Sequence, residues 1–129
     1  MARYSHGYDD TYDPSMPVVD VIVRDVVTGM HTAPMTAIVD SGADGCLVPL
    51  TVLQDLNLRP IRRARMRGVS GIGQSVEVFL VALEIGPIII KGIRVIGDGE
   101  GNELIIGRNV LNQFVVTLNG LAGEVEIVS

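Results

Sequence analysis

The alternation of apolar and polar residues along the chain predicts a fold built mainly of β-strands. Apolar stretches of strand length are separated by short segments that contain glycine, proline, asparagine or aspartate, as in strands joined by turns. The pattern predicts strands over residues 16–27, 33–39, 46–49, 61–69, 74–85, 88–96, 104–107, 115–118 and 124–128. The first two of these strands and the last two have the spacing of hairpins.

Two stretches have the spacing of short helices. Residues 50–58 carry apolar side chains at every third position and are followed by Pro60, and a second short helix is expected over residues 108–114. The 19 valines and 13 isoleucines, against five aromatic residues, favour sheet over helix. A chain of 129 residues is large enough for one domain with its own core.

Charge and cysteine content exclude several classes of protein. The net charge of −5 and a pI near 4.8 argue against a general nucleic-acid binder. The single cysteine excludes a disulfide framework, and neither histidine has ligands at metal-binding spacing, so we expect no metal and no cofactor. No apolar run reaches the length of a membrane helix and the first residues lack a signal-peptide core, so we expect a cytoplasmic location.

The first fifteen residues differ from the rest of the chain. They are polar, rich in tyrosine and aspartate, and without periodicity up to Asp13-Pro14. We therefore expect a flexible N-terminal arm over residues 1–15, followed by the folded domain over residues 16–129.

An aspartate directly after a buried strand is the first candidate for chemistry. Ala37, Ile38 and Val39 run into Asp40-Ser41-Gly42, and aspartate is depleted in strands and seldom buried without partners. Gly42 allows a bend that turns backbone N–H groups onto the carboxylate, which could then polarise a water. The same triplet is also common turn chemistry that needs no catalysis.

A second stretch carries an arginine where a strand stops. Residues 104–107 are apolar up to Gly107, and Arg108-Asn109 follow. We expect Arg108 to be buried beside these apolar residues, and arginine is seldom buried unpaired, so Arg108 requires a carboxylate partner in a buried ion pair. Cys46, by contrast, has no candidate base beside it in sequence, so we interpret it as a small core residue.

Three further segments have a biased composition. Five arginines lie between residues 59 and 67, and are either a solvated strand face or a rim that attracts acidic substrate. A glycine-rich tip over residues 68–73 joins two strands and lacks the helix and third glycine of a dinucleotide fingerprint. Residues 98–103 depart from a calcium loop at the sixth position, so we interpret them as an acidic loop.

The order of these motifs resembles that of the retropepsin-like aspartic proteases. An apolar strand enters Asp40-Ser41-Gly42-Ala43, a glycine-tipped hairpin follows, and Ile-Ile-Gly-Arg-Asn ends at Asn109. The resemblance implies an all-β, closed, barrel-like fold with one or two short helices and a flap hairpin. It assigns catalysis to Asp40, Ser41 and Gly42, and peptide contacts to Ala43 and Asp44.

The resemblance also implies further contacts. The flap tip would be Gly71, Ile72 and Gly73, and Arg108 would pair with Asp44, with Gly107 and Asn109 as structural neighbours. This sequence has Ser41 where retroviral members usually have threonine. Its last residues form a hairpin instead of a single short strand, which argues against a terminal dimer sheet of the retroviral style.

The chemistry of peptide hydrolysis by carboxylates requires two of them, which share one proton. This chain has a single Asp-Ser-Gly sequence, so the second copy would come from a two-fold symmetric homodimer. The resulting hypothesis is an aspartic endopeptidase that binds extended peptides, without nucleic acid or a membrane segment. The alternative is a dimerisation or peptide-binding module that keeps the fold and cleaves little.

Overall fold

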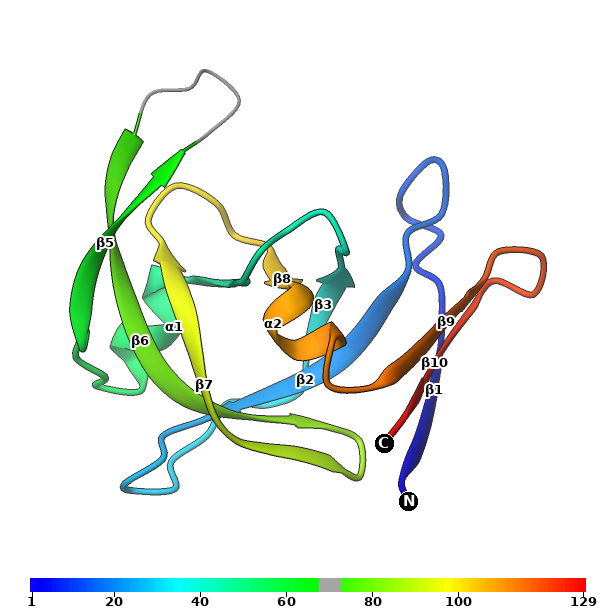
Figure 1. The fold of residues 1–129 in the computed structure, drawn as a ribbon, viewed down its shortest axis with the longest axis horizontal. Helices are drawn as coiled ribbons and strands as arrows, with labels where there is room; N and C mark the ends of the chain where they lie inside the picture. The colour runs from blue at the N-terminus through cyan, green and yellow to red at the C-terminus, as the bar shows by residue number, and fades with distance from the viewer. Residues whose placement is uncertain (68–72) are drawn as a thin grey trace.

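The computed structural model describes residues 1–67 and 73–129, and its centre is a closed ring of six strands (Figure 1). Around the ring the strands follow the order β2 (Val18–Arg24), β3 (Met35–Val39), β8 (Leu104–Ile106), β4 (Cys46–Pro49), β7 (Ile88–Asp98) and β6 (Gly73–Ile85). The pairing of β2 with the end of β6 closes it. The predicted all-β fold with a barrel and short helices is confirmed.

Strand β5 (Arg62–Arg67) lies outside this ring. It pairs antiparallel with the first part of β6, so that Arg62 is opposite Val78 and Arg65 is opposite Ser75. The later part of β6, from residue 82 to 84, pairs with β2 instead. β6 therefore belongs to the ring at one end and to a projecting hairpin at the other, which stands at the upper left of Figure 1.

A second sheet joins the two ends of the chain. Its order is β1 (Arg3–Gly7), β10 (Glu124–Val128) and β9 (Val115–Asn119), all antiparallel. The predicted C-terminal hairpin is thus present. The expectation of a flexible arm missed β1, because this polar strand is defined by backbone pairing with a partner about 120 residues away and has no apolar alternation of its own.

The core is mainly aliphatic and lies inside the ring and beneath the second sheet. Residues on alternate positions of β2 are fully buried, as are Val125 and Ile127 of β10, which attach the terminal sheet to the barrel. Helix α1 (Leu50–Asp55) buries Leu53 against this core and ends before the predicted residue 58. The chain turns at Asn57, which has a positive φ of 57°.

Helix α2 (Arg108–Leu111) is one turn long and stops earlier than predicted. It follows β8 directly, so it begins beside the end of β3, to which β8 is paired in parallel. Within the described residues, no helix is long and apolar enough to cross a membrane.

Candidate active site

Asp40 lies where β3 ends, and its position is fixed by the strand beside it. The Asp40 backbone N–H donates to the carbonyl of Ile106 at 3.0 Å, which continues the parallel pairing of β3 with β8. Its Oδ1 accepts a hydrogen bond from the N–H of Gly42 at 2.8 Å, and the N–H of Ala43 donates to the Asp40 carbonyl at 3.2 Å. The loop therefore orients the carboxylate while the side chain stays half-buried and accessible.

The segment after β8 lies directly against the loop that follows Asp40. The N–H of Arg108 donates to the carbonyl of Ala43 at 2.9 Å, and the N–H of Asn109 donates to that of Asp44 at 3.2 Å. A Cβ on Gly107 would lie 2.4 Å from the Gly45 carbonyl oxygen, so only glycine allows this approach. Two motifs more than sixty residues apart thus form one unit.

Arg108 and Asp44 form an ion pair, as the resemblance implied. The Arg108 Nη2 donates to Asp44 Oδ1, and Nη1 donates to the Ser41 carbonyl at 2.7 Å. The expectation that the pair is buried was wrong. The Asp44 side chain is 94% exposed and that of Arg108 is 42% exposed, because the pair lies across the surface of the loop. Solvent weakens the ion pair to the level of a surface interaction.

Asn109 connects three segments beneath the loop. Its Nδ2 donates to the carbonyl of Arg94 at 3.0 Å, and its Oδ1 accepts from the thiol of Cys46 at 3.2 Å. The Cys46 sulfur in turn accepts from the N–H of Gly107 at 3.5 Å. Burial raises the pKa of this thiol to about 11, so Cys46 holds structure and does not act as a nucleophile. The sequence analysis named Cys46, Gly107 and Asn109 as structural residues but did not predict the contacts among them.

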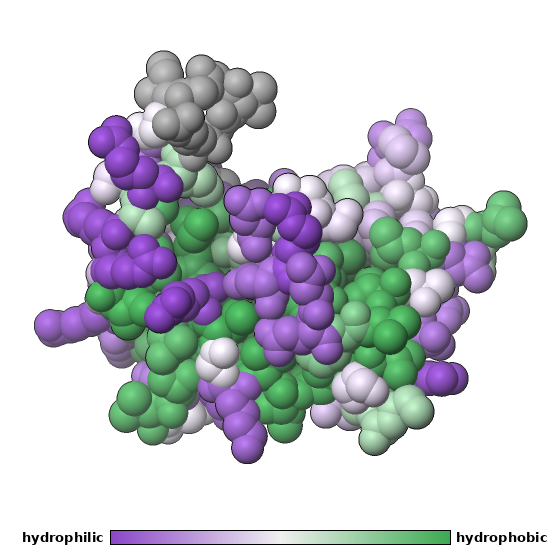
Figure 2. Space-filling model, viewed as in Figure 1, coloured by the Kyte–Doolittle hydropathy of each residue, from purple (hydrophilic) through white to green (hydrophobic). Residues whose placement is uncertain are grey.

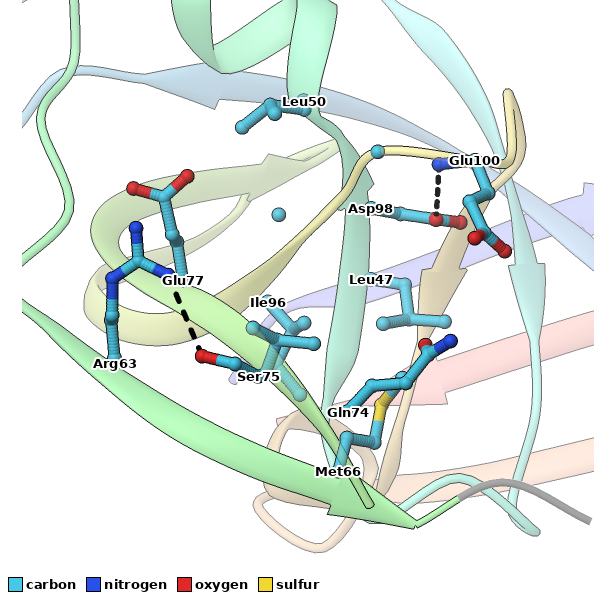
Figure 3. A pocket seen from close by; sticks show the side chains of 13 residues that line it. Leu47, Leu50, Arg63, Met66, Gln74, Ser75, Glu77, Ile96, Asp98 and Glu100 are labelled. Atoms are coloured by element: carbon cyan, nitrogen blue, oxygen red, sulfur yellow. Dashed lines mark hydrogen bonds between the residues drawn. The ribbon is translucent and has the colours of Figure 1, made fainter. Parts of the chain in front are cut away.

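Two adjoining cavities extend from the loop of residues 40–45, which we call the active loop. One of about 460 Å³ is lined by residues 42–45 and by Ala64, Arg65 and Met66 of β5. The other, of about 480 Å³, lies between the β5–β6 hairpin and the segment that follows β7 (Figure 3). Both cavities are lined by four apolar side chains: Leu47, Met66, Val76 and Ile96. They therefore form one groove that runs from the active loop along the hairpin.

The polar lining of the second cavity comes from both sides. Arg63, Ser75 and Glu77 reach it from the hairpin, and Asp98 and Glu100 reach it from the end of β7 (Figure 3). Arg63 donates to the Ser75 hydroxyl at 3.5 Å, and the Asp98 carboxylate accepts from the N–H of Glu100 at 3.0 Å. The groove thus combines an apolar floor with a polar rim.

A family model described as "gag-polyprotein putative aspartyl protease" matches residues 26–113, about two thirds of the chain. The match includes Asp40, Arg108 and the β5–β6 hairpin between them. The chain belongs to this gag-type aspartyl protease family. Among proteins with curated descriptions, none matches the chain by sequence.

Solved structures share the fold of this chain at low sequence identity. A retropepsin-like aspartic protease from Rickettsia conorii aligns over 98% of this chain and 90% of its own, with 13% identity and a TM-score of 0.69. The retroviral protease-like domain of Ddi1 from Leishmania major aligns over 88% and 94%, with 18% identity and a TM-score of 0.55. The fold is therefore retropepsin-like.

Three predicted site residues remain, namely Gly71, Ile72 and Gly73. Gly71 and Ile72 are outside the described residues, and Gly73 is the first residue of β6. Tyr12 donates to the Glu103 carboxylate, which raises the Tyr12 pKa and ties the segment after β1 to the start of β8. The sequence analysis missed this contact, because the two residues are 91 positions apart.

Proposed function

We propose that the protein is an aspartic endopeptidase that acts as a homodimer, with one Asp40 from each subunit at the two-fold axis. Membership of an aspartyl protease family and the retropepsin-like fold support peptide hydrolysis. The observation that carries the proposal is the Asp40 carboxylate, which is held by the Gly42 N–H at the end of β3 beside a groove of peptide-binding size.

The chemistry explains why two subunits are needed. A carboxylate that takes a proton from water and a carboxyl that protonates the leaving amine must both be present, and two adjacent carboxyls fulfil these functions by sharing one proton. The chain supplies one Asp-Ser-Gly sequence. A water between the two Asp40 side chains attacks the scissile carbonyl, the gem-diol accepts a hydrogen bond from the protonated carboxyl, and the amine leaves with a proton from the dyad.

The substrate is an extended peptide that lies in the groove. Its backbone contacts the loop at Gly42, Ala43 and Asp44, and its apolar side chains pack against the floor that Leu47 and Ile96 provide. The hydroxyl of Ser41 reaches the partner's loop across the axis. Arg108, Gly107 and Asn109 support this loop from beneath.

A mixing experiment tests the dyad. Asp40→Asn should abolish cleavage of a mixed peptide library, because the amide cannot act as a base. Excess Asp40→Asn protein should also inactivate the parent by subunit exchange, since each mixed dimer has one carboxylate. Asp55→Asn, which removes an exposed carboxylate at the end of α1, is the matched control and should leave cleavage unchanged.

Sedimentation measured in parallel relates activity to assembly. Specific activity should fall when the protein is diluted below its dimer dissociation constant, and Ser41→Ala should raise that constant before it alters the chemistry. Full activity from a monomer, or from the Asp40→Asn homodimer, would falsify the shared dyad. A parent protein that binds library peptides as a dimer without cleaving them would instead be a binding module.

A further inference from the structure

Positive charge is concentrated in one segment of this acidic chain. Residues 56–76 contain five of the ten basic residues and no aspartate or glutamate, whereas the rest of the chain contains all fifteen acidic residues. The segment thus carries a charge of +5 on a protein with a net charge of −5. Such segregation creates a local field that attracts anionic groups.

Four arginines of this segment are exposed and form no ion pair within the part of the chain that the structure describes. Arg59, Arg62, Arg63 and Arg65 are exposed to solvent, and none of them lies within 4.0 Å of a carboxylate among the described residues. Arg63 has a 3.5 Å contact to Ser75, and Arg65 has one to the Gly73 carbonyl. A guanidinium has five N–H donors, so most of them remain available.

The strand that carries them has a free edge. Among the described residues, each strand of the ring has a neighbour on both sides, whereas β5 pairs with β6 alone. Alternate N–H and C=O groups of β5 therefore face away from the sheet, which allows another extended segment to pair with it. Figure 2 shows hydrophilic side chains gathered on the side of the molecule where this hairpin lies.

We infer that the free edge of β5, over residues 62–66, is a docking surface for an extended acidic segment of the protein substrate. The substrate assignment rests on the proposed function, because Ala64 and Met66 of the same strand line the groove beside the active loop. Side chains alternate along a strand, so Arg63 and Arg65 share one face. Acidic residues at every second position of the bound segment would meet both arginines.

Binding to a catalytically inactive protein tests this surface separately from hydrolysis. A fluorescent peptide with glutamate at every second position is titrated into Asp40→Asn protein, and anisotropy is measured at low and high salt. We expect saturable binding that weakens as salt rises. Replacing Arg62, Arg63 and Arg65 by glutamine should weaken binding about tenfold, because Arg63 and Arg65 each lose an exposed ion pair worth a few-fold, while Arg62, on the opposite face, contributes only to the local positive field.

Two controls make the comparison specific. Glutamine at Arg3 and Lys91, exposed basic residues on β1 and β7, should change the affinity less than twofold, and a lysine version of the peptide should not bind. In active parent protein, an acidic extension on a cleaved peptide should lower KM about tenfold without changing kcat, and the triple variant should lose this advantage.

Three results would overturn the inference. They are absence of binding by the acidic peptide, equal affinity of the triple variant and the control variant, and tighter binding by a single-stranded oligonucleotide of equal charge. In the last case the arginines would form a nucleic-acid surface. Because the binding arm uses Asp40→Asn protein, failure of the proposed hydrolysis leaves the anisotropy result interpretable.

Discussion

The two ends of strand β6 show two different uses of the same sheet. Near Val81 and Leu83 the strand lies within the closed ring and is fully buried. Near Ser75 and Glu77 it forms the projecting hairpin with β5, and the side chains are exposed or half-buried. Both ends belong to one continuous strand. They differ in burial because different numbers of strands and side chains pack around them.

The two regions have different functions: the ring holds the site in place, and the hairpin lines the groove that leads to it. The ring fixes Asp40, because β3 has a paired neighbour on each side and the loop after it is bonded to the segment after β8. The hairpin has a free edge and lines the groove with side chains such as Ala64 and Met66. Substitutions should therefore cost stability in the ring and affect binding on the hairpin.

The largest loss of stability is expected at Gly107, where the two motifs touch. In Gly107→Ala the new Cβ would lie 2.4 Å from the Gly45 carbonyl oxygen and 2.9 Å from that of Ala43. Because backbone has to move, the free energy of unfolding should fall by about 3 kcal/mol or more, measured by urea denaturation. Gly99→Ala is the control, since a Cβ there meets nothing within 4 Å. A Gly107→Ala protein as stable as the control would contradict the close approach.

The next largest effect on stability is expected from a valine-to-alanine substitution, which can be made at both ends of β6. Val81→Ala in the ring should lower the free energy of unfolding by about 2 kcal/mol, since it removes two fully buried carbon atoms and leaves a cavity. Val76→Ala on the half-buried hairpin should cost less than about half of that. Thermal unfolding of the two variants gives the comparison. Equal losses would mean that the hairpin is packed as tightly as the ring.

The ion pair between Arg108 and Asp44 should contribute little to stability. Because both side chains are exposed, a double-mutant cycle with Arg108→Ala and Asp44→Asn should give a coupling energy of about 1 kcal/mol or less, reduced further by salt. A coupling of several kcal/mol, as for a buried pair, would show that the pair is shielded from water, as a partner subunit over the loop would cause.

The smallest effect concerns the turn at the far end of β3 from Asp40. Hydrogen bonds from the Val27 N–H and the Thr28 hydroxyl hold the pKa of Asp25 below its ordinary value of 3.8. The carboxylate therefore stabilises the fold above about pH 4, and this contribution is lost as the pH falls through the lowered folded-state pKa. Asp25→Asn should be less stable than the parent at neutral pH and equal to it in strong acid, as urea denaturation at several pH values would show. A pH-independent difference would contradict this linkage.

Local sequence was sufficient to predict most of the strands and to identify the candidate catalytic aspartate. The period-two pattern predicts most strands because one face of each lies against the core, and the change from β-branched residues to Asp40-Ser41-Gly42 marks a strand that ends in a loop. The need of Arg108 for a carboxylate was also predictable, since an arginine beside apolar residues needs one, whereas its assignment to Asp44 came from the resemblance. These inferences depend on residues adjacent in the chain or on a recognisable motif.

Which strands pair with one another, and which side chains are buried, became known only from the tertiary structure. β1 was missed because its partner is at the opposite end of the chain, and the exposure of Arg108 was misjudged because burial depends on every segment packed around a residue. The sequence predicted that β5 is a strand, but a strand pattern does not encode its number of neighbours. The ring closes through β2 and β6, and this closure leaves β5 with its free edge.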